Sequence, residues 1–240
     1  MFGVFGEYDG ARDLTIASAD GSAARHLAQQ TADDEQPAFL PDGQTLVFAG
    51  RPKQGAPLDL YTVASSGTSL TRLTTSGAQQ PAPCANGSIA FVHRGDVYLV
   101  SADRRTQRRL TLRGGNSPDC SPDGRWIAFV RHQDLYLISS VGRRVRRLTT
   151  HHVLDGKPAF APTGQQIAIT ATFPCSSSFG NCCADETSPA CRDGSDALEV
   201  IDLRGRVRWQ LFTHCDVNGS VAEGGCDALG GVAWQPLSRR

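Results

Sequence analysis

Ser-Pro-Asp-Cys-Ser-Pro-Asp-Gly, residues 117–124, is the stretch that decides the fold of this chain. Related phrases stand at residues 36–43, 81–87 and 157–164, and each is followed by an apolar run, a polar gap and two further short runs. Aligned positions lie 44, 37 and 40 residues apart, at Pro41, Ala85, Pro122 and Pro162. A period near 40 that holds four short strands is typical of a β-propeller blade.

Local physical chemistry supports the same unit. Pro-Asp-Gly suits a tight turn because proline presets φ at one corner and glycine accepts a positive φ after it. The runs after the turns, such as 45–49, 88–92 and 126–130, are almost wholly apolar, as in a strand buried on both faces. The fourth runs, such as 70–74 and 145–149, alternate polar and apolar residues, which predicts a half-exposed outer strand. No stretch shows a helical period, so the sequence predicts an all-β chain.

These motifs carry a family resemblance. Ser121-Pro122-Asp123-Gly124, followed by Asp134-Leu135-Tyr136 and by Arg147-Leu148-Thr149, resembles the TolB-type (WD40-like) β-propeller repeat. The resemblance covers four clear copies and one diverged copy. It implies the fold and says little about function, because the family spans periplasmic scaffolds, surface proteins and non-catalytic caps of peptidases. TolB itself has six blades and an N-terminal domain, neither of which is predicted here, so a role in the Tol system is not carried over.

The two ends of the chain are predicted to complete one blade. The N-terminus begins with a second-strand run at 2–6 and lacks an inner strand, and the run at 232–237 supplies one in matching register. This closure leaves no open sheet edge between the end blades. We therefore predict a single β-propeller domain over residues 1–240, with five four-stranded blades and with insertions at about 173–197 and 214–230.

Composition limits the partners. Formal net charge is zero, which argues against nucleic acid as a partner. Arginine-rich clusters at 104–109 and 143–147 fall on outer-strand and hairpin positions, where solvated edges that resist strand pairing are expected. No run of 18 apolar residues exists, so we expect no membrane insertion, and a monomer is expected.

The eight cysteines are the evidence for the compartment. Their even number and their place in loops favour disulfides, and hence a periplasmic, cell-surface or secreted protein. Met1 leads straight into a strand, so we expect a mature domain with a new start codon and without its signal sequence. We predict bridges Cys84–Cys120 and Cys215–Cys226, and two more among Cys175, Cys182, Cys183 and Cys191. Zinc held by Cys182, Cys183 and Cys191 is the alternative, but the spacing lacks a Cys-x-x-Cys pair.

The insertions are the predicted site of function. Both should emerge on one face of the fifth blade, where long ordered loops usually carry function. The predicted binding residues are Phe173, Phe179, His214 and Asp216. The alternative is that the insertions merely cover the channel mouth.

Other candidate residues share that face. Histidines and carboxylates in its loops could bind a metal, although solvated surface charge is favoured and we predict neither a metal nor a cofactor. These residues are His151, His152, His214, Asp33, Asp34, Glu35, Asp155, Asp216, Glu223 and Asp227. An aspartate recurs once per blade, at Asp13, Asp59, Asp96 and Asp134, which predicts a structural role in anchoring loops.

No catalytic motif is recognisable: there is no Gly-x-Ser-x-Gly, no His-Glu-x-x-His and no phosphate-binding loop. We predict a non-catalytic exported interaction module that binds a protein or peptide partner on the insertion-bearing face. A glycan-binding or glycan-processing propeller, and the sensor or cap domain of a longer receptor or peptidase, remain as alternatives.

Overall fold

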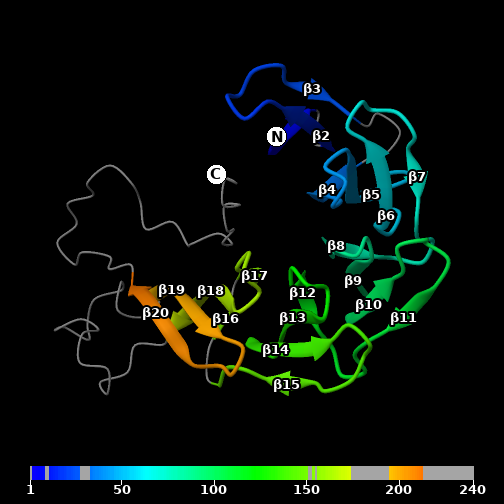
Figure 1. The fold of residues 1–240 in the computed structure, drawn as a ribbon. Helices are drawn as coiled ribbons and strands as arrows, with labels where there is room; N and C mark the ends of the chain where they lie inside the picture. The colour runs from blue at the N-terminus through cyan, green and yellow to red at the C-terminus, as the bar shows by residue number, and fades with distance from the viewer. Residues whose placement is uncertain are drawn as a thin grey trace.

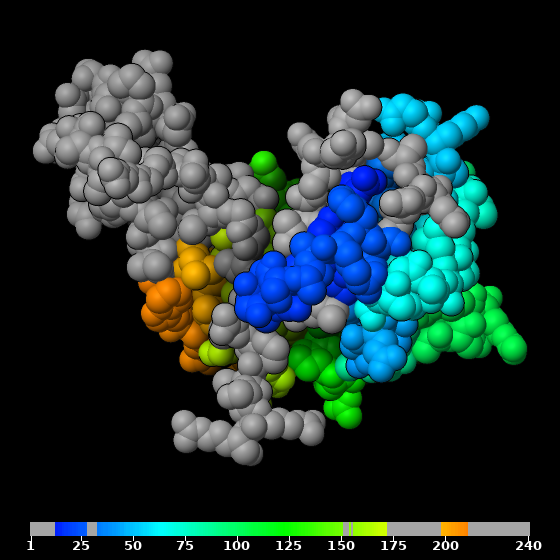
Figure 2. Space-filling model, turned by 90° about the horizontal axis from the view of Figure 1, so that it is seen from above, coloured from blue at the N-terminus to red at the C-terminus, as the bar shows by residue number. Residues whose placement is uncertain are grey.

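The computed structural model describes residues 2–8, 11–27, 33–150, 153–154, 156–173 and 195–212. Within these ranges the chain is all β, without a helix, and forms five antiparallel sheets. The sheets follow one another in an arc around a common centre (Figure 1). Figure 2 shows the same succession in space-filling form, with the first sheet (blue) against the second (cyan). We call these sheets the first to fifth blades.

Each blade is a meander of short strands. The first blade comprises β1 (Phe2–Tyr8), β2 (Ala11–Ala17) and β3 (Arg25–His26). The second comprises β4 (Asp33–Phe39), β5 (Thr45–Arg51), β6 (Asp59–Ala64) and β7 (Thr71–Arg72). The third comprises β8 (Gln79–Pro83), β9 (Ile89–His93), β10 (Asp96–Val100) and β11 (Gln107–Arg109).

The last two blades continue the pattern. The fourth blade comprises β12 (Asn116–Cys120), β13 (Trp126–Arg131), β14 (Asp134–Ser139) and β15 (Arg146–Arg147). The fifth comprises β16 (Val153–Leu154), β17 (Ala159–Phe160), β18 (Gln166–Phe173), β19 (Ser195–Asp202) and β20 (Val207–Phe212), and both β16 and β17 pair with β18. The predicted five-bladed propeller architecture is confirmed.

The first blade is built as the sequence predicts. Strand β1 pairs with β2 from Phe2 opposite Ala17 to Tyr8 opposite Ala11, so the chain does begin with a second-strand run. The predicted closing strand 232–237 lies outside the described residues, and ring closure therefore stays a prediction. No helix long and apolar enough to span a membrane occurs in the part of the chain that the structure describes.

The outer strands are shorter than predicted. The run 70–74 was expected to be a strand, yet β7 covers only Thr71 and Arg72. The chain leaves the strand at this point because the Thr74 hydroxyl turns inward and accepts a hydrogen bond from the Leu60 amide, at 2.9 Å. The same departure recurs after β11 and β15, so it is a feature of the repeat.

The Pro-Asp-Gly turns are stabilised by their own aspartates. Asp42 accepts hydrogen bonds from the amides of Gln44 and Thr45, at 2.8 and 2.9 Å, and Gly43 has a φ of 65°. The Gln44 amide, followed by the Thr45 hydroxyl and amide, holds the pKa of Asp42 below its ordinary value. The predicted turn, with glycine at a positive φ, is confirmed, whereas the hydrogen bonds of the aspartate were not predicted.

The hydrophobic core lies in the seams between neighbouring blades. The second strands of the second, third and fourth blades each place a phenylalanine with no solvent exposure, or almost none, in a seam, where its ring stacks or tilts against a tyrosine of the third strand. The pairs are Phe48 with Tyr61, Phe91 with Tyr98 and Phe129 with Tyr136. Because every blade buries its faces against its neighbours, one blade could not be stable alone.

Candidate functional site

The propeller has two faces, which carry different sets of loops. The insertion face carries the connections β5–β6, β9–β10, β13–β14 and β18–β19, together with the loops that lead from each outer strand to the next blade. The turn face carries the Pro-Asp-Gly-type turns and the hairpins that join third and fourth strands. Strand β18 ends at Phe173, which pairs with Ser195 at the start of β19. The predicted insertion 173–197 therefore begins and ends in a regular strand pair.

Most of the predicted binding residues cannot be placed. Phe179, His214 and Asp216 lie outside the described residues, and Phe173 is placed by its backbone at the end of β18. The acidic candidates Asp33 and Asp34 are placed: Asp33 forms an ion pair with the Arg51 Nε at 3.1 Å, and Asp34 is fully buried. Within the described residues no group of three potential metal ligands comes together.

The recurring aspartate anchors the loops of the insertion face. Asp96, almost fully buried at the start of β10, accepts hydrogen bonds from the Thr111 hydroxyl at 2.8 Å and from the Gly114 amide at 2.9 Å. It also forms an ion pair with Arg109. Burial opposes ionisation of Asp96, but the hydrogen bonds from Thr111 and Gly114 and the contact with Arg109 outweigh it and lower the pKa.

The same anchor recurs in two other blades. Asp59 binds Arg72, Thr74 and the Gly77 amide, and Asp134 binds Arg147 and Thr149. The predicted structural role is thus confirmed at three of the four positions. In the first blade, His26 stands opposite Thr15 where the second, third and fourth blades have arginine, so Asp13 has no arginine at this position, and the loop after Leu27 lies outside the described residues.

Two of the three anchored loops are also held by the following blade. The carbonyl of Gly77 meets the His93 Nδ1, and the carbonyl of Gly114 accepts a hydrogen bond from the Arg131 Nε at 2.9 Å. The Arg131 guanidinium lies over the rings of Phe129 and Tyr136, 5.1 and 5.0 Å from their centres. A single loop glycine therefore bonds one blade through its N–H and the next blade through its C=O. This arrangement fixes the loop between the second and third blades and the loop between the third and fourth blades, and we call these two loops the stiff platform.

A ladder of polar groups runs along the inner strands. The amide of Gln80 donates to the side-chain oxygen of Gln36, and the amide of Ser117 donates to the side-chain oxygen of Gln80, both at 2.7 Å. The three residues occupy equivalent bulges and have φ values of 56°, 55° and 49°. The side chains of Gln36 and Gln80 link successive blades near the centre of the ring, a role that the sequence analysis missed. The only sign of this role in the sequence was the polar residue that precedes each of Pro37, Pro81 and Pro118.

Asp119 is a carboxylate of the inner strands whose pKa is shifted by its surroundings. It is partly buried, and its Oδ2 accepts a hydrogen bond from the Phe160 amide at 2.7 Å. Burial raises the pKa of Asp119, while Lys157 and the amides of Phe160 and Cys120 oppose the rise. The other inner strands place alanine at this position, at Ala38, Ala82 and Ala159, so the departure of Asp119 from the repeat is visible in the sequence.

The raised pKa of Asp119 predicts a specific pH dependence. A carboxyl whose pKa is raised on folding favours the folded state fully only below its unfolded value, here 3.8, and that contribution is lost as pH rises through the folded pKa. We expect Asp119→Asn to be more stable than the unmodified protein at pH 7 and equal to it near pH 3, because the asparagine oxygen can still accept from Phe160. Urea unfolding at both pH values measures this. If the two proteins differ in their free energy of unfolding by the same amount at pH 3 and pH 7, the predicted pH dependence is contradicted.

The fifth blade departs furthest from the repeat. Glu199 is buried where the third strands of the second, third and fourth blades have tyrosine, and it accepts a hydrogen bond from the Gln210 Nε2 at 2.6 Å. Register places Ala197 at the position of the anchoring aspartate, opposite Phe212. The blade that carries both insertions thus lacks the aspartate that holds loops elsewhere.

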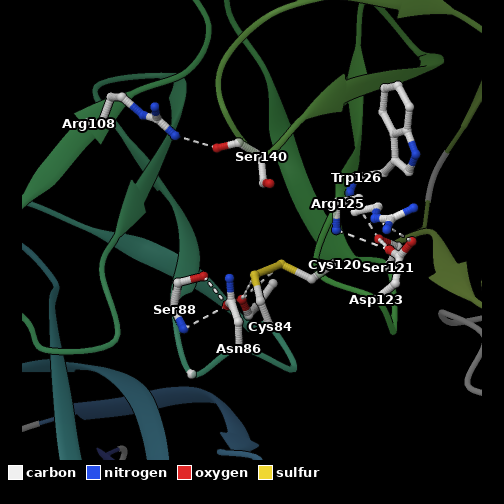
Figure 3. The surroundings of a disulfide bond; sticks show 12 residues. Cys84, Asn86, Ser88, Arg108, Cys120, Ser121, Asp123, Arg125, Trp126 and Ser140 are labelled. Atoms are coloured by element: carbon white, nitrogen blue, oxygen red, sulfur yellow. Dashed lines mark hydrogen bonds and ion pairs between the residues drawn. A yellow bond between two sulfur atoms is a disulfide. The ribbon is translucent and has the colours of Figure 1, made fainter.

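A disulfide joins the inner regions of the third and fourth blades (Figure 3). Cys84 follows β8 and Cys120 ends β12, with their Cα atoms 5.1 Å apart. The predicted Cys84–Cys120 bridge is confirmed. The remaining cysteines lie outside the described residues, so the other predicted pairings stay predictions.

Comparison with known proteins identifies the fold. No protein-family model and no curated protein matches the chain. Among solved structures, the putative TolB of Agrobacterium tumefaciens is 20% identical, with a TM-score of 0.65 over 83% of this chain and 74% of that one. TolB of Acinetobacter baumannii is 17% identical, with a TM-score of 0.62 over 88% of this chain and 51% of that one.

A third similar structure is a puromycin-hydrolyzing peptidase of Mycobacterium tuberculosis. It is 15% identical, with a TM-score of 0.61 over 82% of this chain and 32% of that one. At these identities the comparisons establish the architecture alone, and the chain has a TolB-type β-propeller fold.

Proposed function

We propose that the chain is a non-catalytic, extracytoplasmic interaction module that binds a protein or peptide partner on the insertion face. The observation that carries the proposal is the double fixation of the loop glycines Gly77 and Gly114 by consecutive blades. Loops that are already rigid lose less conformational entropy when a partner binds. The Cys84–Cys120 disulfide supports an oxidising compartment.

The insertions provide the contacts in this proposal. Phe173, Phe179, His214 and Asp216 would present apolar and charged side chains above the stiff platform, as a small number of anchors does in most interfaces. The similar TolB structures make a scaffold role reasonable, because the propeller of such a protein need not catalyse a reaction.

Deletion of residues 176–190 tests the proposal. We expect the deleted protein to lose partner capture from native lysate or culture medium by at least about tenfold, because Phe179 and most of the first insertion are removed. The propeller should still unfold in one cooperative transition, which circular dichroism measures. Capture that survives the deletion unchanged would place the site elsewhere.

A photo-crosslinking control makes the test specific to the face. p-Benzoylphenylalanine at position 173 should form crosslinks to the partner, whereas the same residue at position 209 should not. Trp209 lies half-exposed on β20 of the same blade, away from the insertion face. Equal crosslinking from both positions would mean that the partner does not select this face.

A second candidate is a cap domain of a longer peptidase. It is favoured by the similarity to the Mycobacterium tuberculosis peptidase, of which this chain matches about a third. A hydrolase domain encoded beside these residues in the parent gene would support the cap, and its absence would favour the independent module.

A further inference from the structure

The turn face carries a strong positive charge over half of the ring. Three neighbouring hairpins, at 101–109, 139–147 and 202–208, contain eleven arginines and two aspartates. The equivalent hairpins of the first two blades, at 17–26 and 64–72, contain two arginines and one aspartate. The chain as a whole is neutral, so this asymmetry is a local property of the third to fifth blades.

Some of these arginines hold the blades together. Arg108 donates to the carbonyl of Ser140 in the next hairpin, and Arg146 does the same to Leu203. Arg109 and Arg147 are the partners of the anchoring aspartates. The clusters that we predicted to be solvated edges are therefore partly structural. They also fix the three hairpins beside one another.

Other arginines have no such role. Arg105, Arg143, Arg144, Arg204 and Arg206 are exposed, and their side chains have no hydrogen-bond or ion-pair partner among the described residues. The two aspartates of these hairpins do not neutralise them. Asp103 accepts from its own turn, and Asp202 is bound by turn amides and by Arg208, which lower its pKa to about 2.

A pocket of about 490 Å³ opens among these charges in the fourth blade. It is lined by Arg125, Trp126, Ser139, Ser140, Val141, Arg143 and Arg144. Its two walls are tied by a hydrogen bond from the Ser140 amide to the Arg125 carbonyl at 2.8 Å. Figure 3 shows Trp126 beside Arg125 at the start of β13, near the turn that holds Asp123. Trp126 is half-buried and packs against the seam between the fourth and fifth blades.

We propose that this pocket and the flanking arginines bind an acidic polysaccharide. An indole ring offers a flat apolar surface to the C–H face of a sugar ring, and planar guanidinium groups bind carboxylates and sulfates in bidentate geometry. The volume of the pocket suits one sugar unit. The neighbouring hairpins would bind the anionic groups of the sugar units on either side of it along the polysaccharide.

Two observations favour a polysaccharide over other polyanions. The Cys84–Cys120 disulfide indicates a compartment in which nucleic acid is not a usual partner. Trp126 lies in the wall of a pocket and does not protrude, so it is placed to receive a ring more than to insert into a bilayer. This site lies on the opposite face from the proposed protein-binding surface and does not depend on it.

Binding of alginate and heparin oligosaccharides to the intact, oxidised chain tests the proposal. Isothermal titration at 50 mM and 200 mM salt should show binding that weakens with salt, and no binding of neutral dextran. We expect Arg143→Ala/Arg144→Ala to weaken binding by about tenfold or more at low salt. The matched control Arg94→Ala/Arg113→Ala removes two exposed arginines of the insertion face and should change affinity by less than about twofold.

Substitutions at Trp126 separate ring stacking from charge. Trp126→Leu should weaken binding by about fivefold with an unchanged salt dependence. Trp126→Phe keeps an aromatic ring and disturbs the packing of the seam less, so it should retain most of the affinity. Failure of both oligosaccharides to bind overturns the proposal, as does an equal loss in the control. Two competitors complete the test: duplex DNA, and vesicles of phosphatidylglycerol and phosphatidylcholine. The proposal is also overturned if either binds as tightly as the oligosaccharides and if Trp126→Leu leaves that binding unchanged.

Discussion

Asp96→Ala is expected to lower the free energy of unfolding by about 2–4 kcal/mol at pH 7. The carboxylate accepts from Thr111 and Gly114 and pairs with Arg109, so its removal leaves a buried hydroxyl and a loop amide without their acceptor. Because Arg109 is itself almost half-exposed, water compensates part of the lost ion pair, and the expected effect lies below that of a fully buried pair. Urea unfolding followed by circular dichroism measures the change.

The chain offers its own control for this substitution. Asp13 occupies the same position in the first blade, opposite a strand that has His26 in place of arginine, and Asp13→Ala should cost less than about 0.5 kcal/mol. The pKa of Asp96 is lowered on folding, so its stabilising contribution is present above the unfolded value of 3.8 and is lost as pH falls through the folded pKa. The gap between the unmodified protein and Asp96→Ala should therefore close in acid. Equal costs at Asp13 and Asp96 would refute the anchoring role.

The second large effect is expected for Cys84→Ser/Cys120→Ser, which should lower the free energy of unfolding by about 3–4 kcal/mol. The bridge closes a segment with a sequence separation of 36 residues, and most of its stabilisation arises because it restricts the unfolded chain. Both sulfur atoms lie in a closely packed seam with Ile127, and serine hydroxyls there would add a desolvation cost.

Reduction distinguishes the bridge from the packing of its sulfur atoms. Dithiothreitol should lower the stability of the unmodified protein by about 3–4 kcal/mol more than that of the double serine variant, because the variant has already lost this bridge. Equal sensitivity of the two proteins to reductant would show that the Cys84–Cys120 bridge contributes little.

The repeat predicts the architecture because each element is specified locally. Apolar runs such as 126–130, turn residues such as Asp123-Gly124 and the recurring aspartates act within one blade, so four imperfect copies in the sequence determine strand order and the anchoring role. The Cys84–Cys120 pair was predictable for the same reason: aligned repeats place the ends of neighbouring inner strands side by side, and the two cysteines stand there one position apart in the repeat.

The features that the sequence analysis missed depend on contacts between blades. Gln36 and Gln80 were not singled out, because their role appears only when a bulge in one inner strand faces the amide of the next. The arginine clusters were interpreted as solvated edges, since the carbonyl groups that receive Arg108 and Arg146 lie 32 and 57 residues further along the chain. Of the four predicted binding residues, Phe173 is placed by its backbone, and the other three stay predictions.

The arginines that reach across the seams also rank the joints of the ring by mechanical strength. Arg25, Arg108 and Arg146 occupy one position of the outer strand, and each ties its blade to a hairpin carbonyl of the next. At the joint between the second and third blades the same position is Thr71, whose hydroxyl donates within its own hairpin, to the Ser69 carbonyl. Among the four joints that the described residues form, the outer edge of that one is where neighbouring blades would part first under tension applied at the rim, and a circular permutation that opens the chain there would sacrifice no arginine tie.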